Sequence, residues 1–117
     1  MIQIKRIYDP KEPGDGQRLL VDRLWPRGLK KEAAGLDGWI RDVAPSNSLR
    51  KWFGHDPALW DVFYQRYVAE LDARPQVWQS ILDSARRGNI TLLYSARDTE
   101  HNNAVVLKAY LEKFLKP

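Results

Sequence analysis

The segment Ile90-Thr91-Leu92-Leu93-Tyr94 constrains the fold more than any other, because it is apolar on both faces of an extended chain. A strand of this kind is typical of the interior of a parallel sheet, where other structure covers both faces. Residues 18–22 form a second short apolar strand, and residues 2–8 alternate isoleucine with polar side chains, which indicates another. Strands are therefore expected both early and late in the chain.

Helical signals occupy the space between these strands and follow the last one. Helices are predicted from the cap Ser46 through Phe53, after Asp56-Pro57, after Arg74-Pro75, and from about residue 100 to about residue 115. Residues 38–44 fit either a further strand or the end of a helix. The pattern predicts a small three-layer, Rossmann-like α/β domain, with a mainly parallel sheet of about four strands and flanking helices.

Composition narrows the class of protein. The 117 residues fit a single domain, residues 1–117, whose five tryptophans and five tyrosines belong mainly in a core or, alternatively, along a ligand surface. The absence of cysteine excludes disulfides, thiolate chemistry and cysteine-ligated metal centres. No apolar run approaches the ~20 residues of a membrane span, and no secretory signal opens the chain. We expect a cytoplasmic protein that does not enter a membrane.

Both apolar strands end abruptly in charged residues, which is the main functional clue. Residues 18–21 lead into Asp22-Arg23-Leu24-Trp25-Pro26-Arg27-Gly28, and residues 90–94 lead into Ser95-Ala96-Arg97-Asp98. The carboxyl ends of strands in an open parallel sheet lie at one edge, where ligands bind in such folds. The two charged segments are therefore expected to form one site.

The segment after residue 95 carries the pattern of an anion site. Asp98 or Thr99 is placed to cap the last helix, whose free amides would attract an anion together with Arg97. The alternative is that Asp98 only caps and Arg97 is solvated. His101 is a candidate general acid or base and Asn102 a candidate substrate contact, although a lone histidine more often has a structural role. The sequence supplies no clear third ligand for a metal.

The segment after residue 21 offers a second set of candidates. Asp22 needs a partner or water, and an internal ion pair with Arg23 or Arg27 would satisfy it. In the functional alternative, Arg23 and Arg27 bind a phosphate or carboxylate, with Gly28 permitting close backbone approach. Asp22 would then orient an arginine or act as a base.

The stretch Leu49-Arg50-Lys51-Trp52-Phe53-Gly54-His55-Asp56 interleaves basic and aromatic residues, as surfaces that bind single-stranded nucleic acid do. Packing roles for Trp52 and Phe53 are the simpler explanation. The net charge of +4 and pI near 9.5 permit polyanion binding, but acidic residues are scattered among the basic ones. Nucleic acid therefore remains an alternative partner.

Three groups of residues resemble one known family. These are Leu20-Val21-Asp22-Arg23-Leu24-Trp25-Pro26-Arg27-Gly28, then Ala44-Pro45-Ser46 with Leu49 to Pro57, and then Leu92 to Asp98 with Glu100-His101-Asn102 and Ala104. Together they are similar to the YeaO-like branch of domain-of-unknown-function family 488, from about Ile4 to Leu111. The resemblance implies a small bacterial or archaeal α/β protein with a parallel, Rossmann-like sheet and no established activity.

The chain departs from the wider family at two places. Many members carry a cysteine near the end of the last strand and a Cys-His-Arg run at the start of the next helix. Tyr94 and His101-Asn102-Asn103 stand at these places here, which removes any thiol-dependent role.

Three functions follow as hypotheses. The first is a site for an anionic small molecule, phosphorylated or carboxylated, with or without catalysis, in which His101 and Asp22 are catalytic and substrate contacts come from Arg23, Arg27, Arg97, Asp98 and Asn102. The second is a basic nucleic-acid-binding or regulatory module. The third is a subunit interface made by the aromatic residues. Cofactor and oligomeric state are not specified by the sequence.

Overall fold

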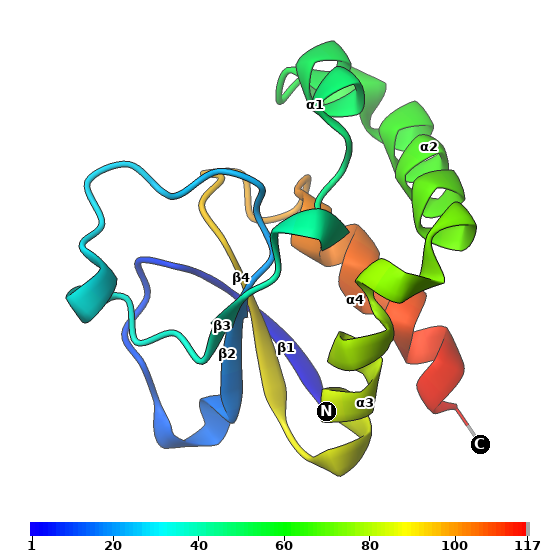
Figure 1. The fold of residues 1–117 in the computed structure, drawn as a ribbon. Helices are drawn as coiled ribbons and strands as arrows, with labels where there is room; N and C mark the ends of the chain where they lie inside the picture. Colours follow the sequence, from blue (N-terminus) through cyan, green and yellow to red (C-terminus); the bar gives the residue numbers. More distant parts are fainter. Residues whose placement is uncertain (117) are drawn as a thin grey trace.

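The computed structural model describes residues 1–116, which form a parallel sheet with helices packed against it (Figure 1). The sheet has four strands in the order β1-β4-β2-β3, and every neighbouring pair is parallel. The strands are β1 (Ile2–Arg6), β2 (Gln17–Leu20), β3 (Gly38–Trp39) and β4 (Ile90–Tyr94). The fully buried β4 lies between β1 and β2, which confirms the central position expected from its apolar sequence.

Four α-helices follow the start signals in the sequence. They are α1 (Asn47–Phe53), α2 (Trp60–Ala73), α3 (Gln79–Arg87) and α4 (Asn103–Leu115). Ser46 caps α1 by accepting a hydrogen bond from the Leu49 amide. Asp56 and Arg74 each lead first into a short 3-10 turn, Pro57–Leu59 and Pro75–Val77, before the α-helix begins.

One face of the sheet packs against α3 and α4, with α2 lying across α4 (Figure 1). The core on this face is made of side chains such as Leu92 from β4, Leu107 and Leu111 from α4, and Tyr67 from α2, each at most 1% exposed. Burying a leucine of this kind contributes roughly 1.5–3 kcal/mol relative to leaving it in water. This core fixes where the carboxyl ends of the strands stand relative to the helices.

The opposite face is covered by the connection between β2 and β3. Since these two strands are parallel, the chain must cross over a face of the sheet between them. The crossover contains only a 3-10 turn, Lys31–Ala33. Its half-buried Trp25, together with Trp39 of β3, covers Leu20 and Leu93. The two indole rings meet edge to face at 5.2 Å. This layer completes the three-layer α/β domain.

A charged cluster lies on this second face, near the amino ends of the strands. The Arg18 guanidinium, 1% exposed, donates to Asp15 at 2.5 Å and to the Gly35 carbonyl oxygen at 3.1 Å. Lys5 donates to Asp15 at 3.2 Å and to Glu12 at 3.0 Å. Arg18 and Asp15 pair inside the protein, which is what burial requires, whereas the Glu12 side chain is exposed.

The structure corrects several boundaries. The strand predicted at residues 2–8 ends at Arg6, and the strand predicted at residues 18–22 spans Gln17–Leu20. Residues 38–44 form the two-residue strand β3 followed by a 3-10 turn, so the strand alternative is correct for the first half. No helix within residues 1–116 has the length and apolar character needed to cross a bilayer.

Candidate functional site

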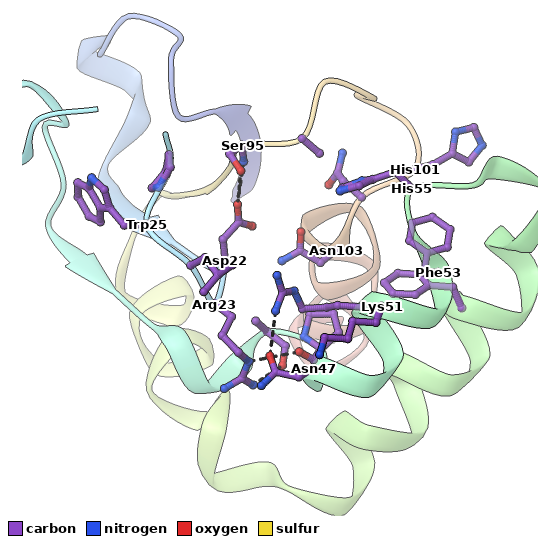
Figure 2. A pocket seen from close by; sticks show the side chains of 18 of the residues that line it. Asp22, Arg23, Trp25, Asn47, Lys51, Phe53, His55, Ser95, His101 and Asn103 are labelled. Carbon is purple, nitrogen blue, oxygen red and sulfur yellow. Dashed lines mark hydrogen bonds between the residues drawn. The ribbon is translucent and has the colours of Figure 1, made fainter. Parts of the chain in front are cut away.

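A cleft of about 730 Å³ opens at the carboxyl ends of β2 and β4 (Figure 2). Its walls come from the segment after β2, from the segment Ala44–His55 that contains α1, and from residues 95–103 before and at the start of α4. A cleft of this size is in the range of sites for small molecules and cofactors. The two charged strand ends therefore converge at one place, as the sequence suggested.

Asp22 and Ser95 form the floor of the cleft and join the two strand ends. One carboxylate oxygen of Asp22, Oδ2, accepts hydrogen bonds from the Ser95 amide at 2.9 Å and from the Ser95 hydroxyl at 2.8 Å. Asn103, at the first turn of α4, donates to the Val21 carbonyl oxygen at 2.9 Å. No ion pair joins Asp22 to Arg23 or Arg27 among residues 1–116, so the internal salt bridge considered from the sequence is absent there.

Arg23 is held by backbone oxygens instead of a carboxylate. Its guanidinium donates to the Ala44 carbonyl oxygen at 3.1 Å and to the Pro45 carbonyl oxygen at 3.4 Å. These bonds tie the end of β2 to the segment that leads into α1. They leave the positive charge of Arg23 without an acidic partner beside the cleft.

Helix α1 presents three polar side chains to the cleft because their spacing places them on one helical face. Asn47, Arg50 and Lys51 are at positions i, i+3 and i+4 and all line the cleft. The Asn47 side chain accepts a hydrogen bond from Arg50 at 2.9 Å, which orients that guanidinium. Arg50 and Lys51 belonged to a nucleic-acid pattern in the sequence, and the Ser46 cap with this spacing indicates only that they share one helical face with Asn47.

The position of α1 is fixed from both ends. The Ser46 amide and hydroxyl donate to the Glu70 carboxylate of α2 at 2.9 and 2.6 Å. At the other end, Phe53 stacks on Phe63 of α2 with ring centres 4.2 Å apart. The chain then turns through Gly54 and His55, both with positive φ, and His55 reaches the cleft.

Trp25, Pro26 and Arg27 form the wall opposite α1. The Trp25 indole donates to the Leu29 carbonyl oxygen at 2.6 Å, which holds this wall in place. Gly28 has a φ of +73° and open space around the position of a Cβ atom. Its requirement for glycine is thus conformational, and does not come from a close approach of another group. Arg27 is exposed and lines the cleft.

The segment before α4 differs from expectation at its cap. Asn102, not Asp98 or Thr99, is the N-cap of α4, because its side-chain oxygen accepts from the Val105 amide at 3.1 Å. Asp98 forms an earlier turn, in which its carboxylate accepts from the amides of Glu100 and His101 at 2.9 and 3.0 Å. The helix therefore starts later than residue 100. Both polar groups of Asn102 are occupied, since its amide nitrogen donates to the Asp98 carbonyl oxygen at 3.0 Å.

His101 lines the cleft and is oriented by its neighbours. Its Nδ1 atom lies 2.9 Å from Asp98 Oδ2, and the Trp60 ring meets the imidazole edge to face at 5.2 Å. The hydrogen bond from the Glu100 amide, together with the bonds from His101, holds the pKa of the Asp98 carboxyl below its usual value. The imidazole thus has one nitrogen engaged within the protein and a fixed ring plane.

Five of the seven residues singled out from the sequence line this cleft: Asp22, Arg23, Arg27, His101 and Asn102. Arg97 and Asp98 do not line it; Arg97 is exposed, and Asp98 acts through the His101 ring. The lining also contains residues that the sequence analysis did not assign to the site, namely Tyr8, Asn47, Arg50, Lys51, His55 and Asn103.

The cleft is unbalanced in charge. Arg23, Arg27, Arg50 and Lys51 line it, and none of them forms an ion pair with a carboxylate of residues 1–116. Among residues 1–116, Asp22 is the only acidic side chain in the lining. No cluster of three potential metal ligands occurs in the part of the chain that the structure describes.

Comparison with known proteins identifies relatives over almost the whole chain. The model of the family DUF488-N3i, described as the inactive DUF488-N3 subclade, matches residues 1–117. The chain is 46% identical to the uncharacterized protein YeaO of Escherichia coli over 94% of its own length and 96% of that protein. It is 36% identical to the uncharacterized protein Rv3073c of Mycobacterium tuberculosis, over 94% and 92% of the two chains. No solved structure matches significantly.

Proposed function

Since the chain belongs to the family described as the inactive DUF488-N3 subclade, we propose that its cleft binds an anionic small molecule without transforming it. The ligand carries a phosphate or a carboxylate. Arg27, Arg50 and Lys51 contact that group, and Asp22 and His101 serve as positioning residues in place of the catalytic roles considered from the sequence.

The observation that carries this proposal is the charge imbalance of the cleft. Arg23, Arg27, Arg50 and Lys51 stand together with Asp22 as the single carboxylate. Like charges gathered in a concave surface repel one another and raise the local positive potential. A bound anion would relieve that repulsion and accept charge-assisted hydrogen bonds, each stronger than a neutral one.

The absence of an activated nucleophile supports binding without catalysis. The chain contains no cysteine. The hydroxyl of Ser95 donates to the Asp22 carboxylate at 2.8 Å, and this carboxylate is a much weaker base than the histidine that usually activates a serine. His101 has Asp98 as its partner, not Ser95. The arrangement orients groups around a ligand but supplies no nucleophile–base pair.

Thermal unfolding in the presence of candidate anions tests the proposal. Phosphorylated and carboxylated metabolites are screened against the native chain and against Arg27→Ala, Arg50→Gln and His101→Ala. A ligand present at 100 times its Kd adds about 2.7 kcal/mol to the free energy of unfolding. We expect stabilisation of the native chain, and a much smaller shift in the two arginine variants.

Arg87→Gln is the matched control. Arg87 is exposed at the end of α3, before β4 begins, so it lies at the opposite end of the sheet from the cleft. The substitution removes one positive charge without touching the site, and it should leave the stabilisation unchanged. Equal losses in Arg87→Gln and Arg50→Gln would show that only the net charge matters and would contradict a defined site.

A further inference from the structure

Tyr8 is an exposed aromatic ring that the fold nevertheless holds in one position. Its side chain lines the cleft and is 45% exposed. The hydroxyl donates to the Arg27 carbonyl oxygen at 3.1 Å, and the Arg6 guanidinium lies over the ring, 5.0 Å from its centre. Arg6 is itself anchored, since it donates to the carbonyl oxygens of Ser95 and Ala96 at 3.1 and 3.0 Å.

An anchored and exposed ring is a binding surface of defined chemistry. A flexible surface tyrosine would lose side-chain entropy on contact with a ligand, whereas Tyr8 is already ordered. Aromatic faces stack on planar rings with little dependence on the substituents of the ring. Tyr8 therefore suits a planar heterocycle at the mouth of the cleft, which the half-buried Trp25 also lines.

The two walls of the cleft differ in chemistry. In Figure 2, Trp25 lies on one side and Lys51 on the other, with Asp22 between them. Tyr8 contacts the Trp25 side through its bond to the Arg27 backbone, whereas Arg50 and Lys51 belong to α1. One wall thus carries the rings of Tyr8 and Trp25 beside Arg27, and the facing wall carries the cations Arg50 and Lys51. A volume of about 730 Å³ exceeds what a lone phosphate needs.

Asp22 has a carboxylate oxygen that is free, within residues 1–116, to accept a hydrogen bond, and a simple anion has no donor for it. Both hydrogen bonds from Ser95 go to Oδ2, so Oδ1 accepts none from the described residues. A carboxylate oxygen in a binding cleft calls for a donor on the ligand, such as a hydroxyl group.

From the rings on one wall, the cations on the facing wall and the carboxylate between them, we infer that the ligand is a nucleoside phosphate. Its base stacks on Tyr8 beside Trp25, a ribose hydroxyl donates to Asp22, and its phosphates contact Arg50 and Lys51. This inference rests on the proposed anion-binding function and adds the class of ligand. A free nucleotide and the terminal nucleotide of an oligonucleotide share this chemistry.

Isothermal titration of the full chain with ADP, GDP, inorganic pyrophosphate and a 5′-phosphorylated trinucleotide tests the inference. We expect a nucleoside diphosphate to bind roughly tenfold more tightly than pyrophosphate, because stacking of one base is worth about 1–3 kcal/mol. Tyr8→Leu should remove that advantage and leave pyrophosphate binding unchanged. Arg50→Gln should weaken all four ligands, roughly tenfold each.

Trp52→Leu is the matched control for Tyr8→Leu. Trp52 is 38% exposed and carries the Arg66 guanidinium over its ring at 4.4 Å, but it does not line the cleft. Its replacement should leave nucleotide affinity unchanged. Tyr8→Phe keeps the ring and should retain most of the affinity, which separates stacking from a role of the hydroxyl.

The outcomes separate the two proposals. Pyrophosphate binding as tight as that of ADP, unaffected by Tyr8→Leu, overturns the nucleotide inference and leaves the anion site intact. No binding of any of the four ligands overturns the nucleotide inference and the phosphate form of the proposed function, and the screen of carboxylated metabolites then decides the carboxylate form. Tighter binding of the trinucleotide than of ADP assigns the site to nucleic-acid ends, and the reverse assigns it to free nucleotides.

Discussion

Two groups of charged side chains lie at opposite ends of the same sheet, and they differ in whether their charges are paired within the protein. At the amino ends, Asp15 receives Arg18 and Lys5, so the charges are neutralised within the protein. At the carboxyl ends, Arg50 and Lys51 line an open cleft without an acidic partner among residues 1–116. The first arrangement stabilises the fold, and the second leaves its charges available to a ligand.

The difference follows from burial. Arg18 is 1% exposed, and a charge withdrawn from water to that extent must be paired and fully hydrogen-bonded. The cations of the cleft keep water as a partner, so nothing in the fold requires them to be neutralised. Charge that folding does not require is therefore the better indicator of function in this molecule. Sequence alone does not separate the two groups, since the cations of both are arginines and lysines.

The largest effect is expected for Arg18→Met, which removes a cation from the buried group that stabilises the fold. Removing one partner of a buried pair leaves an incompletely compensated charge, and we expect a loss of about 3 kcal/mol in the free energy of unfolding. Urea denaturation measures it. Arg50→Met is the control in the cleft and should change stability by no more than about 0.5 kcal/mol. Similar losses for both variants would contradict the distinction between the two groups.

The pH dependence of stability sharpens the same comparison. Burial alone would raise the pKa of Asp15, but hydrogen bonds from the Glu12 amide and from the Arg18 and Lys5 side chains outweigh burial and hold that pKa below 3.8. The bond to Glu12, opposed by burial and aided by Asp15, raises the pKa of Lys5 above 10.5. A depressed carboxyl pKa stabilises the fold above the unfolded value, and a raised lysine pKa stabilises it below the unfolded value.

Stability should therefore be highest between these limits. It should fall as the pH drops below about 3.8 through the folded pKa of Asp15, and again as the pH rises above about 10.5 through that of Lys5. Urea midpoints measured across the pH range provide the test. Lys5→Met should reduce both losses, because Lys5 also lowers the pKa of Asp15. A variant with an unchanged alkaline limb would show that this cluster does not set the pH dependence.

The smallest effect is expected for Asp22→Asn. This variant makes the charge of the cleft more positive, whereas substitution of an arginine makes it less positive. It removes the single negative charge of the lining, so the affinity for inorganic pyrophosphate should rise roughly threefold. The free energy of unfolding should fall by about 1 kcal/mol, since Ser95 loses a charged acceptor but keeps an amide oxygen. Titration calorimetry and urea denaturation give the two numbers. Weaker pyrophosphate binding would mean that Asp22 orients a cation of the site.

The site could be predicted in part because it depends on topology. Two parallel strands that lead into polar or charged residues, Asp22 after β2 and Ser95 after β4, meet at one edge of the sheet in any fold of this class. The hydrogen-bond partners of those side chains are less directly predictable from the sequence. Asp22 bonds to Ser95 instead of to an arginine, and Asn102 takes the cap position expected of Asp98 or Thr99. Local patterns allow several partners, and packing selects one.

The remaining residues of the cleft come from elements far away in the chain. Tyr8 follows the edge strand β1, and Arg50 belongs to a helix that Glu70 of α2 holds in place through Ser46. The direction of β1 places Tyr8 at this edge of the sheet, but nothing in the local sequence of Arg50 shows that α1 lies beside it. These residues come together in the cleft only when the helices pack on the sheet.

The sequence by itself determined the class of fold, the central strand and the edge of the sheet where charge gathers, because these depend on periodicity, apolar runs and strand direction. Tertiary structure decided which charges are neutralised and which are left for a ligand, because that depends on burial and on partners distant in the chain. Arg18 and Arg50 are the same residue type, and only their surroundings make one structural and the other available for binding.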